Sequence, residues 1–104
     1  MKTAKHIAIG MVACGLLVAG NVQADQALAQ AKGCMACHQV ATKVVGPAYK
    51  DVAAKYKDQA DAAEMLAAKV KAGGVGTWGQ IPMPPNAHVS EDNIRTIVTW
   101  VLSL

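Results

Sequence analysis

The chain has 104 residues, of which ten are basic and seven acidic, so its formal charge is +3. Two of the basic residues, Lys2 and Lys5, precede an apolar N-terminal run; without this segment eight basic and seven acidic residues remain, a charge of +1. A charge so close to neutral argues against a nucleic-acid partner, which requires a strongly basic face. The remaining length corresponds to one domain. A hydrophobic core of this size gives only marginal stability unless a further cross-link or bound group supports it.

The first 24 residues have the pattern of a secretory signal peptide. Two lysines precede an apolar run from Ile7 to Ala19, and Val22-Gln23-Ala24 has small residues at the positions that a signal peptidase reads. The run is shorter than the roughly 20 residues of a membrane-spanning helix, which argues against a permanent anchor. Cys14 raises the alternative of a lipid-modified cysteine, but the apolar run continues beyond it. We therefore expect residues 1–24 to be a cleavable signal and residues 25–104 the mature domain.

The mature domain opens with a stretch that favours helix. Asp25 is a good N-cap, and residues 26–32 have high helix propensity. This helix leads into the sequence Cys34-Met35-Ala36-Cys37-His38. If residues 29–38 are helical, the two cysteines share one face and the histidine follows one turn after the first of them.

The Cys-x-x-Cys-His motif is typical of covalent haem attachment, because two thiols can join the vinyl groups while the imidazole reaches the iron. A thioredoxin-like dithiol predicts a βαβ pattern, which the sequence lacks. An iron–sulfur cluster usually needs four cysteines, more than the mature chain has. A structural zinc site also needs four ligands. The mature chain offers four candidates for it: Cys34, Cys37, His38 and His88. We favour a haem, which would also stabilise the small core.

A loop and a short helix are expected after the motif. The chain to Gly46 reads as loop, and Pro47 can begin a helix that runs to about Tyr56, because its fixed φ suits a first helical turn. Tyr49 and Val52 should face inward from this helix.

Two further helices follow. Asp61 and Glu64 have the spacing of a capping box ahead of an apolar helix, which Gly73 should end. Ser90 is the expected N-cap of the last helix. The apolar residues of this helix recur at helical spacing and predict a core-facing stripe: Ile94, Ile97, Val98, Val101 and Leu102.

Residues 73–88 contain four of the nine glycines and three of the four prolines, so they can form neither a helix nor a central strand. A loop this stiff, with Met83 between two prolines, suggests a side chain held in a fixed direction. The alternative is that Met83 fills a gap in the core, as most methionines do. With one axial position of the haem open, we favour Met83 as its ligand, because histidine and methionine are a common axial pair.

Together these motifs resemble the small bacterial class I cytochromes c of the cytochrome c-551/c-552 type. The resemblance rests on the Cys-x-x-Cys-His motif and on the segments 45–49 (VGPAY), 76–79 (GTWG) and 81–86 (IPMPPN), and it covers essentially the whole mature chain. It implies an all-α fold in which four to five short helices surround one covalently attached haem c.

The resemblance also implies a set of site residues. Cys34 and Cys37 hold the haem, and His38 and Met83 are the axial iron ligands. Three further residues support them: the Pro47 carbonyl accepts a hydrogen bond from the ring N–H of His38, Trp78 donates to a haem propionate, and Asn86 contacts the methionine ligand. One departure is that the chain has no phenylalanine in its first helix.

The implied function is electron transfer and not enzymatic catalysis, since two filled axial positions leave no place for dioxygen. We expect a periplasmic monomer that shuttles single electrons between respiratory-chain donors and terminal reductases or oxidases, with a membrane cytochrome complex among its partners and no stable membrane insertion. A haem enzyme or gas sensor, in which Met83 leaves the iron, is the alternative. Apolar residues including Val45 and Ile81 are expected to form the docking surface, rimmed by Lys32, Lys43 and Lys50.

Overall fold

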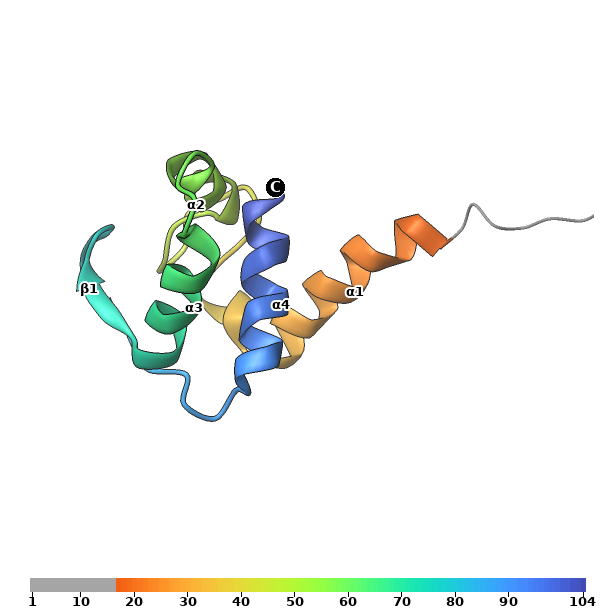
Figure 1. The fold of residues 1–104 in the computed structure, drawn as a ribbon. Helices are drawn as coiled ribbons and strands as arrows, with labels where there is room; N and C mark the ends of the chain where they lie inside the picture. Colours follow the sequence, from red (N-terminus) through yellow and green to blue (C-terminus); the bar gives the residue numbers. More distant parts are fainter. Residues whose placement is uncertain (1–16) are drawn as a thin grey trace, which may run out of the picture.

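The computed structural model describes the backbone of residues 17–104 and the side chains from residue 24 onward. These residues form four α-helices, one 3₁₀ helix and a two-stranded hairpin (Figure 1). In chain order the elements are α1 (Leu17–Ala31), η2 (Cys34–Ala36), α2 (Tyr49–Tyr56), α3 (Ala62–Ala72), β1 (Gly74–Gly76), β2 (Gly79–Met83) and α4 (Glu91–Leu102). The prediction of four to five short helices is confirmed.

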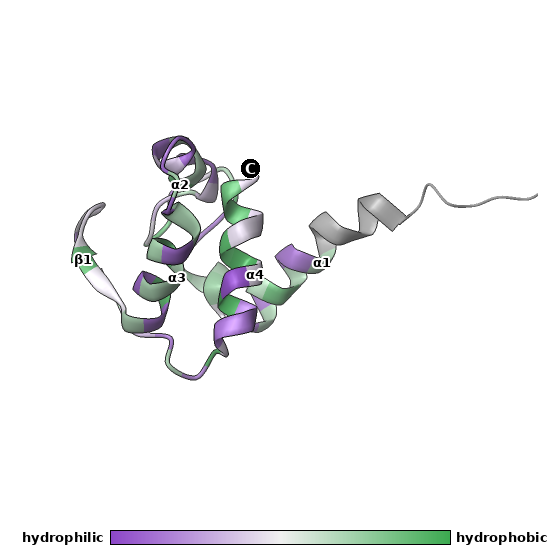
Figure 2. Cartoon of the chain, in the orientation of Figure 1, coloured by the Kyte–Doolittle hydropathy of each residue, from purple (hydrophilic) through white to green (hydrophobic). Residues whose placement is uncertain are grey.

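Helix α4 is the centre of the core, because α1, α2 and α3 all pack against it. The hydroxyl of Ser90 accepts a hydrogen bond from the backbone N–H of Asn93 at 3.2 Å, so the predicted cap is present. Figure 2 shows apolar and polar stretches alternating along this helix. Its buried side chains are Ile94, Ile97, Val98, Trp100 and Val101.

Helix α1 begins earlier than predicted. It runs without interruption from Leu17, so Asp25 lies inside the helix and is not an N-cap in the full chain. The residues before Asp25 also tolerate helix, and nothing in the sequence stops it there. Residues 17–24 of the expected signal therefore form the start of α1. This first part of the helix projects away from the other helices, whereas its end packs against α4 (Figure 1). Residues 1–16 of that signal lie outside the described part of the chain.

The Cys-x-x-Cys-His motif does not continue α1. Gly33 has a φ of 87°, a left-handed conformation that costs roughly 1–2 kcal/mol for a residue with a side chain. The chain turns there and enters η2, in which the backbone N–H groups of Cys37 and His38 donate to the Cys34 carbonyl at 3.2 and 3.1 Å. A continuous helix over residues 29–38, the condition considered from the sequence, is therefore absent because α1 ends at Ala31, but the tight turn keeps Cys34 and His38 close.

Helix α2 begins two residues after Pro47. Ala48 is its N-cap, so Pro47 precedes the helix instead of opening it. Tyr49 and Val52 are buried, as predicted.

Helix α3 begins without the predicted capping box. Asp61 stands at the N-cap position, but its side chain makes no capping bond and instead accepts a hydrogen bond from Gln59 Nε2 at 3.0 Å. Gly73 ends the helix as predicted, with a φ of 78°.

The glycine-rich segment contains an antiparallel hairpin that the sequence did not predict. Gly74 pairs with Met83 and Gly76 with Gly79, so Trp78 lies in the turn. Pro82 is compatible with β2 because both strands of a two-stranded sheet are edge strands. No helix within residues 17–104 is both long and apolar enough to cross a membrane.

Candidate functional site

The loop after the Cys-x-x-Cys-His motif folds back along the motif. The backbone N–H of Gly46 donates to the Cys37 carbonyl at 2.8 Å, and that of Tyr49 donates to the Gln39 carbonyl at 2.9 Å. These bonds bring the residues around Pro47 beside the side chain of His38.

One hydrogen bond determines the tautomer of the neutral His38 ring. Its Nδ1 lies 2.8 Å from the carbonyl oxygen of Pro47. A carbonyl can only accept, so Nδ1 carries the proton and Nε2 of the neutral ring keeps its lone pair. This is the tautomer that binds a metal through Nε2.

Two more residues enclose the same imidazole. The ring of Tyr49 stacks on it, with centroids 4.8 Å apart and planes inclined by 18°. On another side lies Gly46, where an added Cβ would come within 2.5 Å of Cε1 of His38. Only glycine therefore fits at position 46 while the ring stays in place.

The two cysteines differ in their surroundings. Both are free thiols; Cys34 packs partly buried against the core and Cys37 is exposed. Burial raises the pKa of the Cys34 thiol, and interaction with the Tyr49 hydroxyl partly offsets this. Burial also raises the pKa of Tyr49, with a smaller contribution from Cys34. Both groups are therefore neutral at neutral pH in the chain with free thiols.

Met83 lies at the end of β2, in a loop held by the last turn of α3. The final carbonyls of a helix have no partner within it. Here the backbone N–H of Asn86 lies 3.2 Å from the carbonyls of Val70 and Lys71, and its side-chain Nδ2 donates to Val70 at 3.1 Å and to Pro84 at 3.2 Å. Asn86 thus ties the loop to the end of α3.

Lys71 and Gly73 strengthen this attachment. The ammonium group of Lys71 donates to the carbonyls of Ala87 at 3.0 Å and Val89 at 2.7 Å. A Cβ at Gly73 would lie 2.6 Å from the carbonyl oxygen of Met83, so the loop passes directly over this glycine. The end of α3 therefore fixes the backbone that carries Met83.

Trp78 lies in the hairpin turn, with 42% of its surface exposed. The ammonium group of Lys55 is 5.7 Å from the centre of its ring and 5.7 Å from that of Tyr56. Both distances are within the range of cation–π attraction.

The structure thus groups the predicted residues into three sets. Cys34 and Cys37 lie with His38 and Pro47, Met83 lies with Asn86, and Trp78 lies near Lys55. Between residues 24 and 104, no hydrogen bond or ring contact joins these sets. The sequence prediction missed the contacts of three residues: Gly46, Tyr49 and Lys71. Only Tyr49 had a signal, its expected inward direction.

The donor set fits a haem better than a metal ion alone. In the described part of the chain, no three His, Cys, Asp or Glu side chains lie close enough to form a metal site, so the zinc ligands considered from the sequence are not assembled. Two adjacent free thiols, an imidazole with an unused Nε2 and a thioether on another loop are what a covalently held haem with two axial ligands requires.

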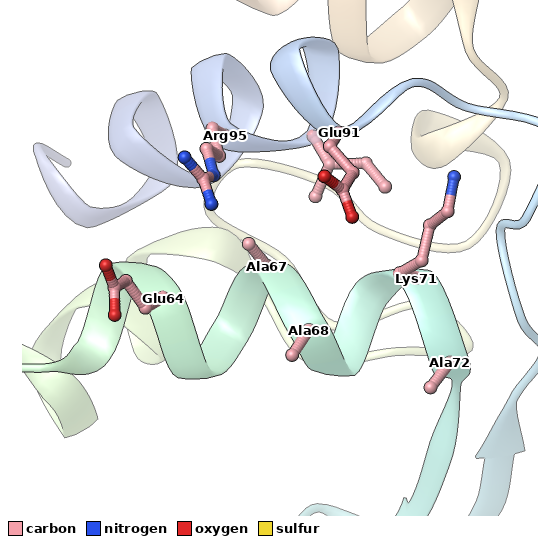
Figure 3. Close-up of a pocket in the computed structure, with 8 residues that line it drawn as sticks. Glu64, Ala67, Ala68, Lys71, Ala72, Glu91 and Arg95 are labelled. Atoms are coloured by element: carbon pink, nitrogen blue, oxygen red, sulfur yellow. The ribbon is translucent and has the colours of Figure 1, made fainter.

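A hollow between α3 and α4 shares Lys71 with the residues described above but has none of the proposed haem ligands in its lining (Figure 3). It contains no cysteine, histidine or methionine and is lined by Glu64, Ala67, Ala68, Lys71, Ala72, Glu91, Ile94 and Arg95. It offers neither thiols nor an imidazole to a cofactor.

Comparison with known proteins gives concordant results. The family model for cytochrome c matches residues 22–104. The chain is 59% identical over 92 residues to cytochrome c-552 of Nitrosomonas europaea, covering 88% of this chain and 89% of that protein. It is 56% identical over 94 residues to cytochrome c-551 of Allochromatium vinosum, covering 90% and 100%.

Solved structures agree. The crystal structure of Nitrosomonas europaea cytochrome c552 superposes with a TM-score of 0.74 at 57% identity, covering 76% of this chain and 98% of that one. A class 1 cytochrome of Sideroxydans lithotrophicus has a TM-score of 0.64 at 32% identity, covering 79% and 94%.

Proposed function

The chain belongs to the cytochrome c family, and from this premise we propose that it is a periplasmic electron carrier with His38 and Met83 as axial haem ligands. Its fold is that of the class I cytochromes c, and its cofactor is one covalently attached haem c. When bound, haem c supplies one-electron exchange between ferrous and ferric iron.

The observation that carries the proposal is the hydrogen bond between His38 Nδ1 and the Pro47 carbonyl. It directs the proton to Nδ1 and leaves Nε2 free for iron. Cys34 and Cys37, in the tight turn just before His38, form the thioether bonds to the vinyl groups. One segment thus provides both the covalent attachment and the first axial ligand.

Met83 is proposed as the second axial ligand. Its loop is tied to α3 by Asn86 and Lys71, which supports a thioether held in one direction. A neutral, soft sulfur ligand favours ferrous iron and raises the reduction potential. With both axial positions filled, dioxygen and peroxide have no place to bind, so the protein transfers electrons without acting as an enzyme.

Trp78 and Asn86 are proposed to support this site. By the resemblance to the class I cytochromes c, the indole N–H of Trp78, in the turn of the hairpin, would donate to a haem propionate. Asn86 acts on Met83 by holding its loop, since both amide hydrogens go to backbone carbonyls, those of Val70 and Pro84.

Residues 1–24 are proposed to be a signal peptide that directs residues 25–104 to the periplasm. Mass spectrometry of the protein from its native compartment should show residues 25–104 plus one haem. Retention of Met1, or a lipid on Cys14, would contradict this. The redox partners are proposed to be periplasmic reductases or oxidases and a membrane cytochrome complex.

Carbon monoxide tests the function directly. It binds ferrous haem only where an axial position is open, so the reduced protein should keep its spectrum when the gas is added. Rapid binding would show that Met83 does not hold the iron and would favour a gas sensor or haem enzyme.

A further inference from the structure

The hydrogen bond to Pro47 does not fully fix the plane of the His38 ring. It restrains Nδ1 and sets the tautomer, but a hydrogen bond tolerates some angular variation, so coupled changes of χ1 and χ2 can still tilt the ring while the bond is kept. A flat surface against the ring face limits this tilt. The ring of Tyr49 is such a surface, nearly parallel to the imidazole at 4.8 Å.

Tyr49 is itself fixed by the core. It is only 6% exposed and is the first residue of α2. Its ring meets that of Trp100 edge to face, with centroids 5.6 Å apart and planes at 82°. Trp100 is 3% exposed and belongs to α4, the helix against which the others pack. A continuous series of rings thus runs from α4 to His38.

We propose that Tyr49 is a positioning residue that sets the plane of the His38 imidazole through its ring and not through its hydroxyl. This inference rests on the proposed ligation of iron by His38. The angle of an axial imidazole about the iron–nitrogen bond determines how its π orbitals overlap with the iron d orbitals. Tyr49 therefore controls the electronic asymmetry of the haem without touching the iron.

The chain supplies a matched control. Tyr56 is the last residue of α2, is also a tyrosine and is 7% exposed, but it makes no ring contact with His38 among the described residues. Replacing either tyrosine with leucine removes a buried ring of equal size and should lower stability similarly. Only the variant at position 49 should change the orientation of His38.

The experiment compares holoproteins carrying Tyr49→Leu, Tyr49→Phe and Tyr56→Leu. Proton NMR of the ferric state reports imidazole orientation through the shifts of the haem methyl groups. Tyr49→Leu should alter this pattern, and exchange of the His38 Nδ1 proton should become roughly two- to twelvefold faster, the factor expected for loss of an aromatic pair. Tyr49→Phe keeps the ring and should match wild type, as should Tyr56→Leu.

The proposal is overturned if Tyr49→Leu leaves the methyl pattern and the exchange rate unchanged, or if Tyr56→Leu changes them equally. Should Tyr49→Leu fail to fold, the wild-type ferrous protein decides: nuclear Overhauser contacts between the rings of Tyr49 and His38 support it, and their absence refutes it. His38→Ala separates the two claims. A haem spectrum unchanged by His38→Ala would contradict the ligation itself, whereas a loss of ligation there with no effect of Tyr49→Leu would contradict only the role of Tyr49.

Discussion

At the scale of single residues, the imidazole of His38 shows how little space the site allows. Its Nδ1 is fixed by Pro47, one face by Tyr49 and the Cε1 edge by Gly46. Each contact comes from the loop that folds back over the motif or from the helix that follows it. The direction of Nε2 is therefore set by the protein and does not require the iron to select it.

The closeness of Gly46 to His38 gives the first prediction. Gly46→Ala places a methyl group 2.5 Å from Cε1, so the ring must move. We expect the holoprotein to lose roughly 1–3 kcal/mol of unfolding free energy, as overpacked cores do, and its haem spectrum to change.

Gly33→Ala is the control for that variant. It has open space around the added Cβ but a φ of 87°, so it should lower stability by about 1–2 kcal/mol without altering the spectrum. If Gly46→Ala also left the spectrum as it was, the ring of His38 would not be confined there. Denaturant unfolding and absorption spectra measure both effects.

The burial of Tyr49 gives a prediction about pH. Burial raises its pKa in the folded state, and this cause persists when Cys34 is joined to the haem. The unfolded chain has the ordinary value of about 10. The folded state therefore favours the neutral hydroxyl, and this stabilisation is complete below about pH 10 and is lost as the pH rises above it.

This pH dependence can be tested by measuring the unfolding free energy between pH 8 and 12. The range extends to either side of the ordinary tyrosine pKa of about 10. The wild-type protein should lose stability more steeply above pH 10 than Tyr49→Phe, which has no group to ionise at that position. Identical slopes would show that the hydroxyl is hydrated in the folded protein.

At the scale of elements, the end of α3 holds the loop that carries Met83. Lys71 donates to two carbonyls of this loop, Ala87 and Val89, and Asn86 donates to the last turn of the helix. A loop rich in proline is already stiff, and these bonds give it a fixed position on the helix. The proposed methionine ligand thus depends on a helix that is remote in sequence from the cysteines.

Lys71→Gln should loosen this attachment, because the shorter side chain cannot reach both carbonyls. We expect a loss of roughly 1.5–3 kcal/mol of unfolding free energy, as for hydrogen bonds made by a charged group, and faster binding of carbon monoxide to the reduced protein. Lys69→Gln is the control: among the described residues, the ammonium group of Lys69 donates to Thr77 Oγ1 alone, at an exposed position of the hairpin. Equal effects of the two variants on gas binding would contradict a specific role for Lys71.

Features that depend on residues within one helical turn could be predicted from the sequence. Features that depend on how distant segments pack together could not. The cap at Ser90 and the end of α3 at Gly73 follow from residues within one turn, and both were predicted correctly. Asp61 stands before α3 but makes no capping bond, because its backbone (φ −98°, ψ 17°) lacks the extended conformation that is usual for an N-cap. The contact of Tyr49 with His38 depends on the packing of α2 against α4, which no local pattern contains.

The hairpin and the start of α1 show the same limit. Pairing of β1 with β2 requires two segments rich in glycine and proline to meet, although neither has strand propensity. The helix across the expected cleavage point has favourable residues on both sides of Asp25, so a good N-cap residue does not by itself start a helix. After cleavage Asp25 would become the first residue of the shortened helix.

At the scale of the whole molecule, apolar side chains are exposed where redox partners are expected to dock. Val44 and Val45 are 50% and 45% exposed and lie in the loop bonded to the carbonyl of Cys37, the exposed attachment cysteine. Ile81 on the hairpin is 66% exposed. Exposed apolar patches of this kind mark interaction sites, and Lys43 provides a neighbouring charge.

The rate of electron exchange with a partner protein should distinguish the effect of the apolar contact from the effect of the neighbouring charge. Val45→Asp should slow electron exchange at every salt concentration, because it changes the contact itself. Lys43→Glu should slow exchange with an acidic partner at low salt, with the difference shrinking toward about 0.15 M, where the screening length is about 8 Å. If neither variant changes the kinetics while the reduction potential is constant, docking occurs elsewhere.

We propose that Met83 completes the coordination of a haem held by Cys34, Cys37 and His38. The most direct measurement is the reduction potential and carbon monoxide binding of Met83→Ala beside Met65→Ala, a second partly buried methionine, on α3. Met83→Ala should lower the potential and bind the gas when reduced, while Met65→Ala should do neither. A Met83→Ala protein with the wild-type potential and no gas binding would contradict the claim and assign the sixth ligand to another residue.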